Sequence, residues 1–193
     1  MFEEIFGYGE IYMPLFPLIG FFIIKKNIPR KEYPLAWFAF TNFVVFTTAE
    51  IMAYSGNNLI VYHFYYAYEL IFITWYFSKN LFKKFSPVFY IISGAFVLVW
   101  LINIITWEPF NTFPITSGVI EKAVIIFLCM YLLLQLAKSE RIMYFQRLPE
   151  FWIVSGFLIA SIIEIFAIGS YKYFDQIIND PSGVTAWLID IAG

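Results

Sequence analysis

Long runs of hydrophobic residues, separated by short polar segments, make up most of the chain. Five runs approach or exceed the roughly 20 residues that cross a bilayer, at residues 34–54, 59–77, 87–107, 115–137 and 151–171, and a shorter first run lies at residues 11–24. They do not alternate with a period of two, which favours helices over a transmembrane barrel. A seventh segment, 184–193, spans only about 15 Å of a roughly 30 Å hydrocarbon core. The pattern predicts an all-α, polytopic transmembrane helical bundle.

We therefore expect one transmembrane domain over residues 1–193, with six full spans and a partial seventh. The partial span is read either as a half-span or as the front of a longer chain. Composition supports the membrane assignment, because 61% of the residues are hydrophobic and 13% are charged, whereas about a quarter are charged in soluble domains. With a net charge of −2 and no basic stripe, we expect the lipid bilayer as a partner and no nucleic acid.

The basic residues are confined to alternate polar segments. Ten of the twelve lie in the turns 25–33, 79–86 and 138–147, whereas the opposite set of segments holds one, Lys172, together with six acidic residues. The positive-inside rule then places the N-terminus outside, and we expect a multi-pass protein of a bacterial inner membrane. Residues 1–10 contain no lysine or arginine, so the first run is expected to stay in the mature protein rather than to be a cleaved signal.

Seven ionisable residues lie inside the predicted spans, where charges are costly and tend to face a cavity or a partner. They are Glu50, His63, Glu69, Glu121, Lys122, Glu164 and Asp190. Counted along the helices, all lie roughly 6 to 15 Å from the outer ends of their spans. We interpret them as the lining of a polar pocket that opens to the outside and receives a small ligand or a cation. Helical spacing places Tyr62 and Tyr66 on the face of Glu69.

Each of these residues also has a plain structural interpretation. Glu50 and His63 are close enough to span ends to reach the interface, and the tyrosines also fit an aromatic belt. Glu121 and Lys122 also fit an ion pair that fixes helix packing. Glu69 and Glu164, the deepest acids, are either ligand-gating groups or polar contacts between helices.

The sequence contains no intramembrane catalytic signature. H-E-x-x-H and G-x-S-x-G motifs are absent, and the chain has one histidine and one cysteine, Cys129. A single histidine excludes a bis-histidine haem or a His-rich zinc site within one chain. We expect no catalytic residue, no metal and no cofactor, and the protein is not expected to be an enzyme.

The runs FWIVSGFLI at 151–159, YEL at 68–70, WYF at 75–77 and WLIDI at 187–191 resemble uncharacterised seven-span membrane proteins of Bacteroidota-type bacteria. Similar spans are found beside, or fused to, histidine kinases. The resemblance implies a sensory membrane module whose partner is a cytoplasmic signalling protein.

The leading hypothesis is a ligand-sensing or signal-coupling bundle. Two alternatives stay open. The first is a transporter, an ion-conducting assembly or a membrane effector, which includes a homo-oligomer. The second is a structural subunit of a membrane complex.

Overall fold

The computed structural model describes residues 12, 14–54, 56–81, 86–138 and 148–179. These residues are helical almost throughout, and the described part contains no strand. The chain divides into two compact units, unit 1 (Met1–Pro114) and unit 2 (Ile115–Gly193), and each is described by itself. The expectation of a single domain over the whole chain stays a prediction.

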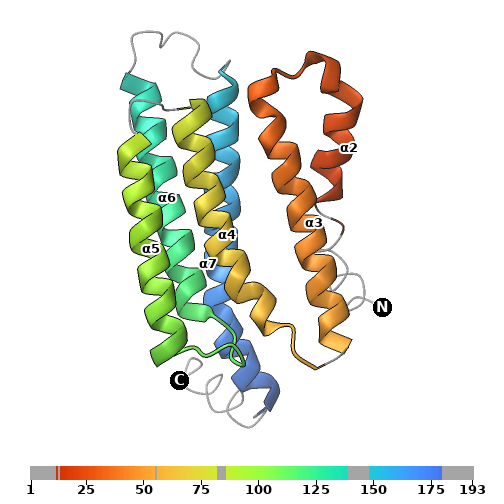
Figure 1. Ribbon diagram of the computed structural model, residues 1–193, viewed down its shortest axis with the longest axis vertical. Helices are drawn as coiled ribbons and strands as arrows, with labels where there is room; N and C mark the ends of the chain where they lie inside the picture. The colour runs from red at the N-terminus through yellow and green to blue at the C-terminus, as the bar shows by residue number, and fades with distance from the viewer. Residues whose placement is uncertain (1–11, 13, 55, 82–85, 139–147, 180–193) are drawn as a thin grey trace, which may run out of the picture. The chain divides into compact units, whose positions relative to one another are not determined.

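Within the described residues of unit 1, four α-helices follow one another in antiparallel succession, α2 (Leu15–Ile24), α3 (Tyr33–Tyr54), α4 (Leu59–Tyr76) and α5 (Ser86–Thr106). Helix α3 packs against α2 and α4, and α4 packs against α5 (Figure 1). Two short 3₁₀ turns, η1 (Lys25–Asn27) and η2 (Arg30–Glu32), join α2 to α3, and a π-helix, η3 (Phe77–Leu81), continues α4. Half of the residues of α4 are buried, so α4 supplies much of the core of this unit.

Unit 2 is a hairpin of two long helices, α6 (Ile115–Lys138) and α7 (Pro149–Asn179), which pack against each other. Apolar side chains of these two helices, such as Ile125, Leu128, Leu132 and Val154, are buried. The sequence predicted an end near residue 171 for the last full span, but α7 continues to Asn179. The polar residues after Tyr171 interrupt the apolar run without interrupting the helix, because they carry no proline or glycine that would end it.

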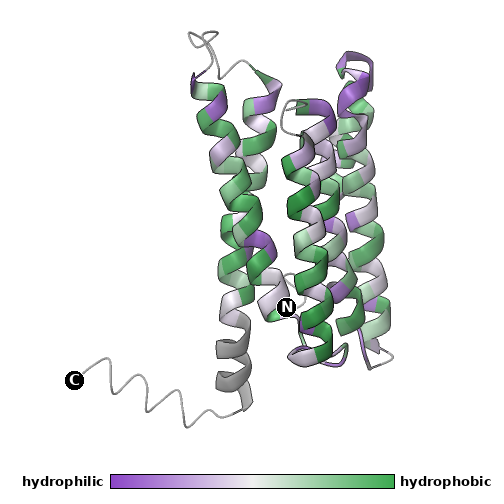
Figure 2. Ribbon diagram, turned by 60° about the vertical axis from the view of Figure 1, so that its left-hand side comes forward, coloured by the Kyte–Doolittle hydropathy of each residue, from purple (hydrophilic) through white to green (hydrophobic). Residues whose placement is uncertain are grey.

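In the part of the chain that the structure describes, four helical segments are long and apolar enough to cross a membrane, at Arg30–Tyr54, Pro87–Thr106, Ile115–Lys138 and Pro149–Ser170. Figure 2 shows hydrophobic residues along these helices and hydrophilic colour where the chain turns between α2 and α3. These segments indicate an integral membrane protein that lies in a lipid bilayer.

The other predicted spans differ in how far the structure supports them. Helix α2 has ten residues and α4 has eighteen, and neither belongs to the four segments above. In α4 the polar His63, Glu69 and several tyrosines lower the hydropathy. The segment 184–193 lies outside the described residues. The count of six spans and a partial seventh therefore stays a prediction.

The two ends of unit 1 differ in charge. Lys25, Lys26, Arg30, Lys31 and Lys79 lie where α2 meets α3 and where α4 ends, and we call this the basic end. The opposite end carries the loop of residues 107–114, and we call it the loop end. Successive helices run antiparallel, so alternate turns lie at opposite ends of the unit. The basic turns therefore lie at one end and the non-basic turns at the other.

Candidate functional site

The sequence-predicted residues fall into separate groups in the two units. Unit 1 holds Glu50, Tyr62, His63, Tyr66 and Glu69, whereas unit 2 holds Glu121, Lys122 and Glu164. Asp190 lies outside the described residues. Whether these side chains share one outward-facing pocket stays a prediction, and each group is described within its own unit.

His63 forms a buried junction between α4 and the loop of residues 107–114. Its side chain is fully buried, and Nε2 lies 2.9 Å from the carbonyl oxygen of Thr112. A carbonyl oxygen only accepts hydrogen bonds, so Nε2 is the donor. The ring also meets Phe110 edge to face, with centroids 5.3 Å apart. The loop is therefore held to the first turns of α4 by a polar and an aromatic contact.

Helix α5 reaches the same junction through Trp100. Its indole Nε1 donates a hydrogen bond to the backbone carbonyl of His63 over 2.9 Å. One turn further, Asn103 Nδ2 donates to Glu108 Oε2 at 2.5 Å, and the Asn103 carbonyl accepts the backbone amides of Trp107 and Glu108 at 2.9 Å. These bonds cap α5 and set the direction in which the loop leaves it. The loop end is thus a connected network of α4, α5 and the loop.

The face of α4 around Glu69 is buried as helical spacing predicts. Glu69, Tyr65 and Tyr66 are all buried, and Tyr62 is half-buried against Phe113 with ring centroids 5.5 Å apart. Nearby, a pocket of about 460 Å³ lies between α3 and α4, lined mostly by apolar side chains with Thr41 and Tyr68. A ligand role for Glu69 and the tyrosines stays a prediction, as does one for Glu50, which is half-buried one turn before the end of α3.

In unit 2, Lys122 lies between two carboxylates. Its ammonium forms an ion pair with Glu164 of α7, and it lies 3.2 Å from Oε2 of Glu121. Lys122 and Glu121 are fully buried, whereas 43% of the Glu164 side chain is exposed. Because a buried ammonium is costly without a partner, the pairing explains how a lysine is tolerated in the middle of an apolar helix. It joins α6 to α7.

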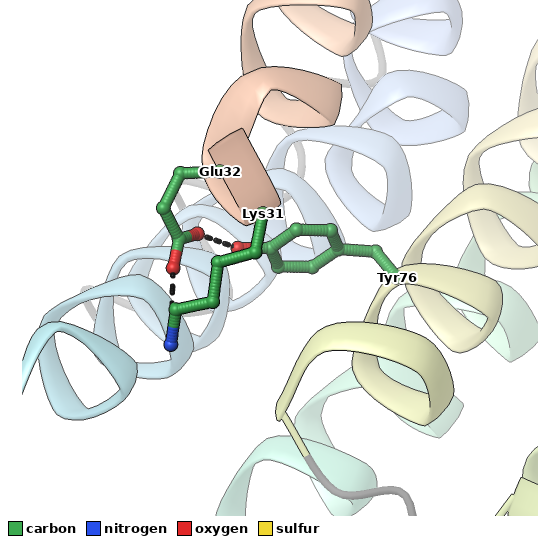
Figure 3. A network of polar contacts seen from close by, with 3 residues as sticks. All are labelled: Lys31, Glu32 and Tyr76. Atoms are coloured by element: carbon green, nitrogen blue, oxygen red, sulfur yellow. Dashed lines mark hydrogen bonds and ion pairs between the residues drawn. The ribbon is translucent and has the colours of Figure 1, made fainter. Parts of the chain in front are cut away.

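The basic end contains a polar network that the sequence analysis did not identify. Pro29 has an extended conformation, and the following turn η2 places Glu32 at the start of α3. The Tyr76 hydroxyl at the end of α4 donates to the Glu32 carboxylate, and Lys31 Nζ lies 3.6 Å from the other oxygen of that carboxylate (Figure 3). Glu32 and Tyr76 are buried. The only signal for this contact in the sequence is a single carboxylate within a basic turn.

Beside this network lies a pocket of about 640 Å³. Its lining includes the side chains Arg30, Lys31, Lys79, Trp75, Ser78 and Asn80. Sequence reasoning used the three cations only as markers of membrane orientation. In the described part of the chain, no three His, Cys, Asp or Glu side chains lie close enough together to hold a metal ion.

Comparisons of the chain with protein-family models, with curated proteins and with solved structures find no match.

Proposed function

We propose that this integral membrane protein is a signal-coupling bundle, in which α4 transmits the state of the loop of residues 107–114 to the basic end of unit 1. The observation that carries the proposal is the junction at His63, where a buried side chain of α4 holds the loop through Thr112. A ligand that binds or displaces the loop acts on α4 directly.

Helix α4 is suited to carry such a displacement. His63 and Tyr76 are thirteen residues apart, which corresponds to about 20 Å of helix. Each is tied to a different part of unit 1, His63 to the loop and Tyr76 to Glu32. Between them the buried side chains of Leu70, Ile73 and Thr74 pack α4 tightly. Since close-packed side chains transmit strain, release at one end is expected to change the contacts at the other.

In the proposed orientation the N-terminus and the loop end are outside and the basic end is in the cytoplasm. The separation of charge within unit 1 supports this orientation through the positive-inside rule. A cytoplasmic signalling protein is the proposed partner at the basic end, in line with the resemblance of several segments to spans that accompany histidine kinases. A bacterial inner membrane is the proposed location.

Thiol labelling in a Cys129→Ala background tests the coupling. A cysteine in place of the buried Ser78, which follows Tyr76 in η3, reports opening of the basic end. His63→Phe removes the hydrogen bond to Thr112 and keeps an aromatic ring. We expect faster maleimide labelling of Ser78→Cys in this variant. Thr106→Val is the matched control, because it removes an exposed hydroxyl at the loop end, where His63 also lies. We expect it to leave the labelling rate unchanged. Equal rates in His63→Phe and the control contradict the proposal.

Ion translocation is the second candidate, and the observation that favours it is the Lys122 cluster. A lysine between two carboxylates, one of them partly exposed, is a group that exchanges protons or cations. Flux into proteoliposomes that carry a pH-sensitive or potassium-sensitive dye distinguishes the two functions. Flux that is lost in Lys122→Met and kept in Lys138→Met favours translocation, since Lys138 is exposed at the end of α6. The signal-coupling proposal predicts no flux above that of empty vesicles.

A further inference from the structure

We propose that the pocket at the basic end of unit 1 binds a phosphate group, carried by an anionic lipid headgroup or by a soluble phosphate compound. This proposal does not depend on the signal-coupling function, because it rests on the charge and lining of the pocket and not on the His63 junction that carries the coupling.

The charge of the pocket is positive and suits an anion. Arg30, Lys31 and Lys79 contribute three cationic groups, of which Lys31 is paired with Glu32, and none of the residues that line the pocket is acidic, so the net charge of the lining stays positive. Glu32, the nearest carboxylate in sequence, is not part of the lining. It is buried, accepts a hydrogen bond from the Tyr76 hydroxyl and pairs with the Lys31 ammonium at 3.6 Å (Figure 3).

The π-helix η3 supplies one wall of the pocket. Ser78, Lys79 and Asn80 all belong to this five-residue segment and all line the pocket. Single π-helical turns are rare and occur frequently at functional sites. The amide nitrogen Nδ2 of Asn80 is buried and has no hydrogen-bond partner within the described residues. Buried donors in native proteins are nearly always satisfied, and an anion in the pocket would supply an acceptor.

The combination of side chains favours phosphate over a smaller anion. A guanidinium presents several donors in one plane and pairs well with phosphate oxygens, and lysines add point charges. The pocket lies where the candidate span Arg30–Tyr54 begins, which is the depth of lipid headgroups in a bilayer. Trp75 lines the pocket beside the cations, and tryptophan is enriched at this depth. Basic pockets between helices at this position bind phosphorylated headgroups.

Binding to the full chain tests the proposal with two probes. One probe is inorganic phosphate, titrated against chloride at constant ionic strength in an uncharged detergent, with thermal unfolding as the readout. The other is phosphatidylglycerol at 20% in phosphatidylcholine nanodiscs, with retained lipid counted by native mass spectrometry. Protection by inorganic phosphate identifies a soluble phosphate compound as a ligand, and retention of phosphatidylglycerol alone identifies a headgroup.

Variants distinguish a built site from a generally positive surface. Arg30→Gln with Lys79→Gln removes two pocket cations, and we expect binding to weaken about 25-fold, at about 1 kcal/mol for each basic residue. Lys25→Gln with Lys26→Gln removes the same charge at the same end from residues that do not line this pocket, and binding stays within about threefold of the parent. Asn80→Leu leaves the charge unchanged and is expected to weaken binding several-fold.

Equal losses in the two double variants overturn the proposal, as does the absence of any response to both probes. Helical content by circular dichroism accompanies each measurement. Because Arg30 and Lys79 are exposed, their substitution is expected to leave the fold intact, and if the double variant fails to fold, Asn80→Leu alone decides. Parent-like binding in a folded Asn80→Leu variant then counts against the site.

Discussion

The indole nitrogen of Trp100 lies 2.9 Å from the backbone carbonyl oxygen of His63. This hydrogen bond joins α5 to α4 at the residue whose side chain also holds the loop. The carbonyl lies within a helix and is available for a second donor because a carbonyl oxygen has two lone pairs. The loop end of unit 1 therefore depends on α5 as well as on the histidine side chain.

Trp100→Phe tests the energetic importance of this bond. The substitution keeps an aromatic ring and removes the donor, and we expect the free energy of unfolding to fall by about 1 to 2 kcal/mol, from the lost hydrogen bond and the smaller ring. Unfolding in detergent by a denaturant, followed by circular dichroism, measures the change. Trp107→Phe is the control, because Trp107 is 74% exposed, and its effect is expected to stay within about 0.5 kcal/mol.

Lys122→Met tests how much the ion pairs of unit 2 stabilise the fold. We expect a loss of about 3 kcal/mol, at the low end of the range for a broken buried pair, because Glu164 is partly exposed. The same unfolding assay measures it. A second substitution, Glu121→Gln, removes the fully buried carboxylate that Lys122→Met leaves behind and is expected to recover part of the loss. A double variant that is less stable than Lys122→Met contradicts this explanation.

Labelling from outside tests the proposed orientation. Asn57 and Asn111 lie at the loop end and Asn27 at the basic end, and all three are exposed. With single cysteines at these positions in intact cells, a membrane-impermeant maleimide is expected to modify Asn57→Cys and Asn111→Cys but not Asn27→Cys. The reverse pattern places the N-terminus and the loop end in the cytoplasm.

Much of the helical pattern is predictable from the sequence because it depends on local composition. The expected spans at 34–54, 59–77, 87–107 and 115–137 coincide with α3, α4, α5 and α6 to within one residue at each end. The burial of Tyr66 and Glu69 on one face of α4 likewise follows from helical periodicity. The presence of an anionic partner for Lys122 was also predictable, since an apolar helix tolerates an ammonium only when it is paired.

The contacts that define the two ends of unit 1 were not predictable in the same way. Tyr76 and Glu32 are 44 residues apart, and His63 and Thr112 are 49 apart. Such pairs form through helix packing, about which the pattern of a single span says nothing. The Thr112 acceptor is a backbone carbonyl, which every residue type provides. The π-helix at 77–81 likewise follows from no local signal in a run that otherwise reads as a continuous helix.

Hydrogen exchange of the backbone amides at residues 76–81 tests most directly the claim that α4 couples the two ends of unit 1. The protein is compared with His63→Phe and with the control Thr106→Val in identical nanodiscs. If α4 transmits release of the loop, amides at 76–81 exchange about fivefold faster in His63→Phe, as expected when local stability falls by about 1 kcal/mol, and at the parent rate in Thr106→Val. Faster exchange confined to residues 59–66 and 107–114, with 76–81 unchanged, contradicts the coupling.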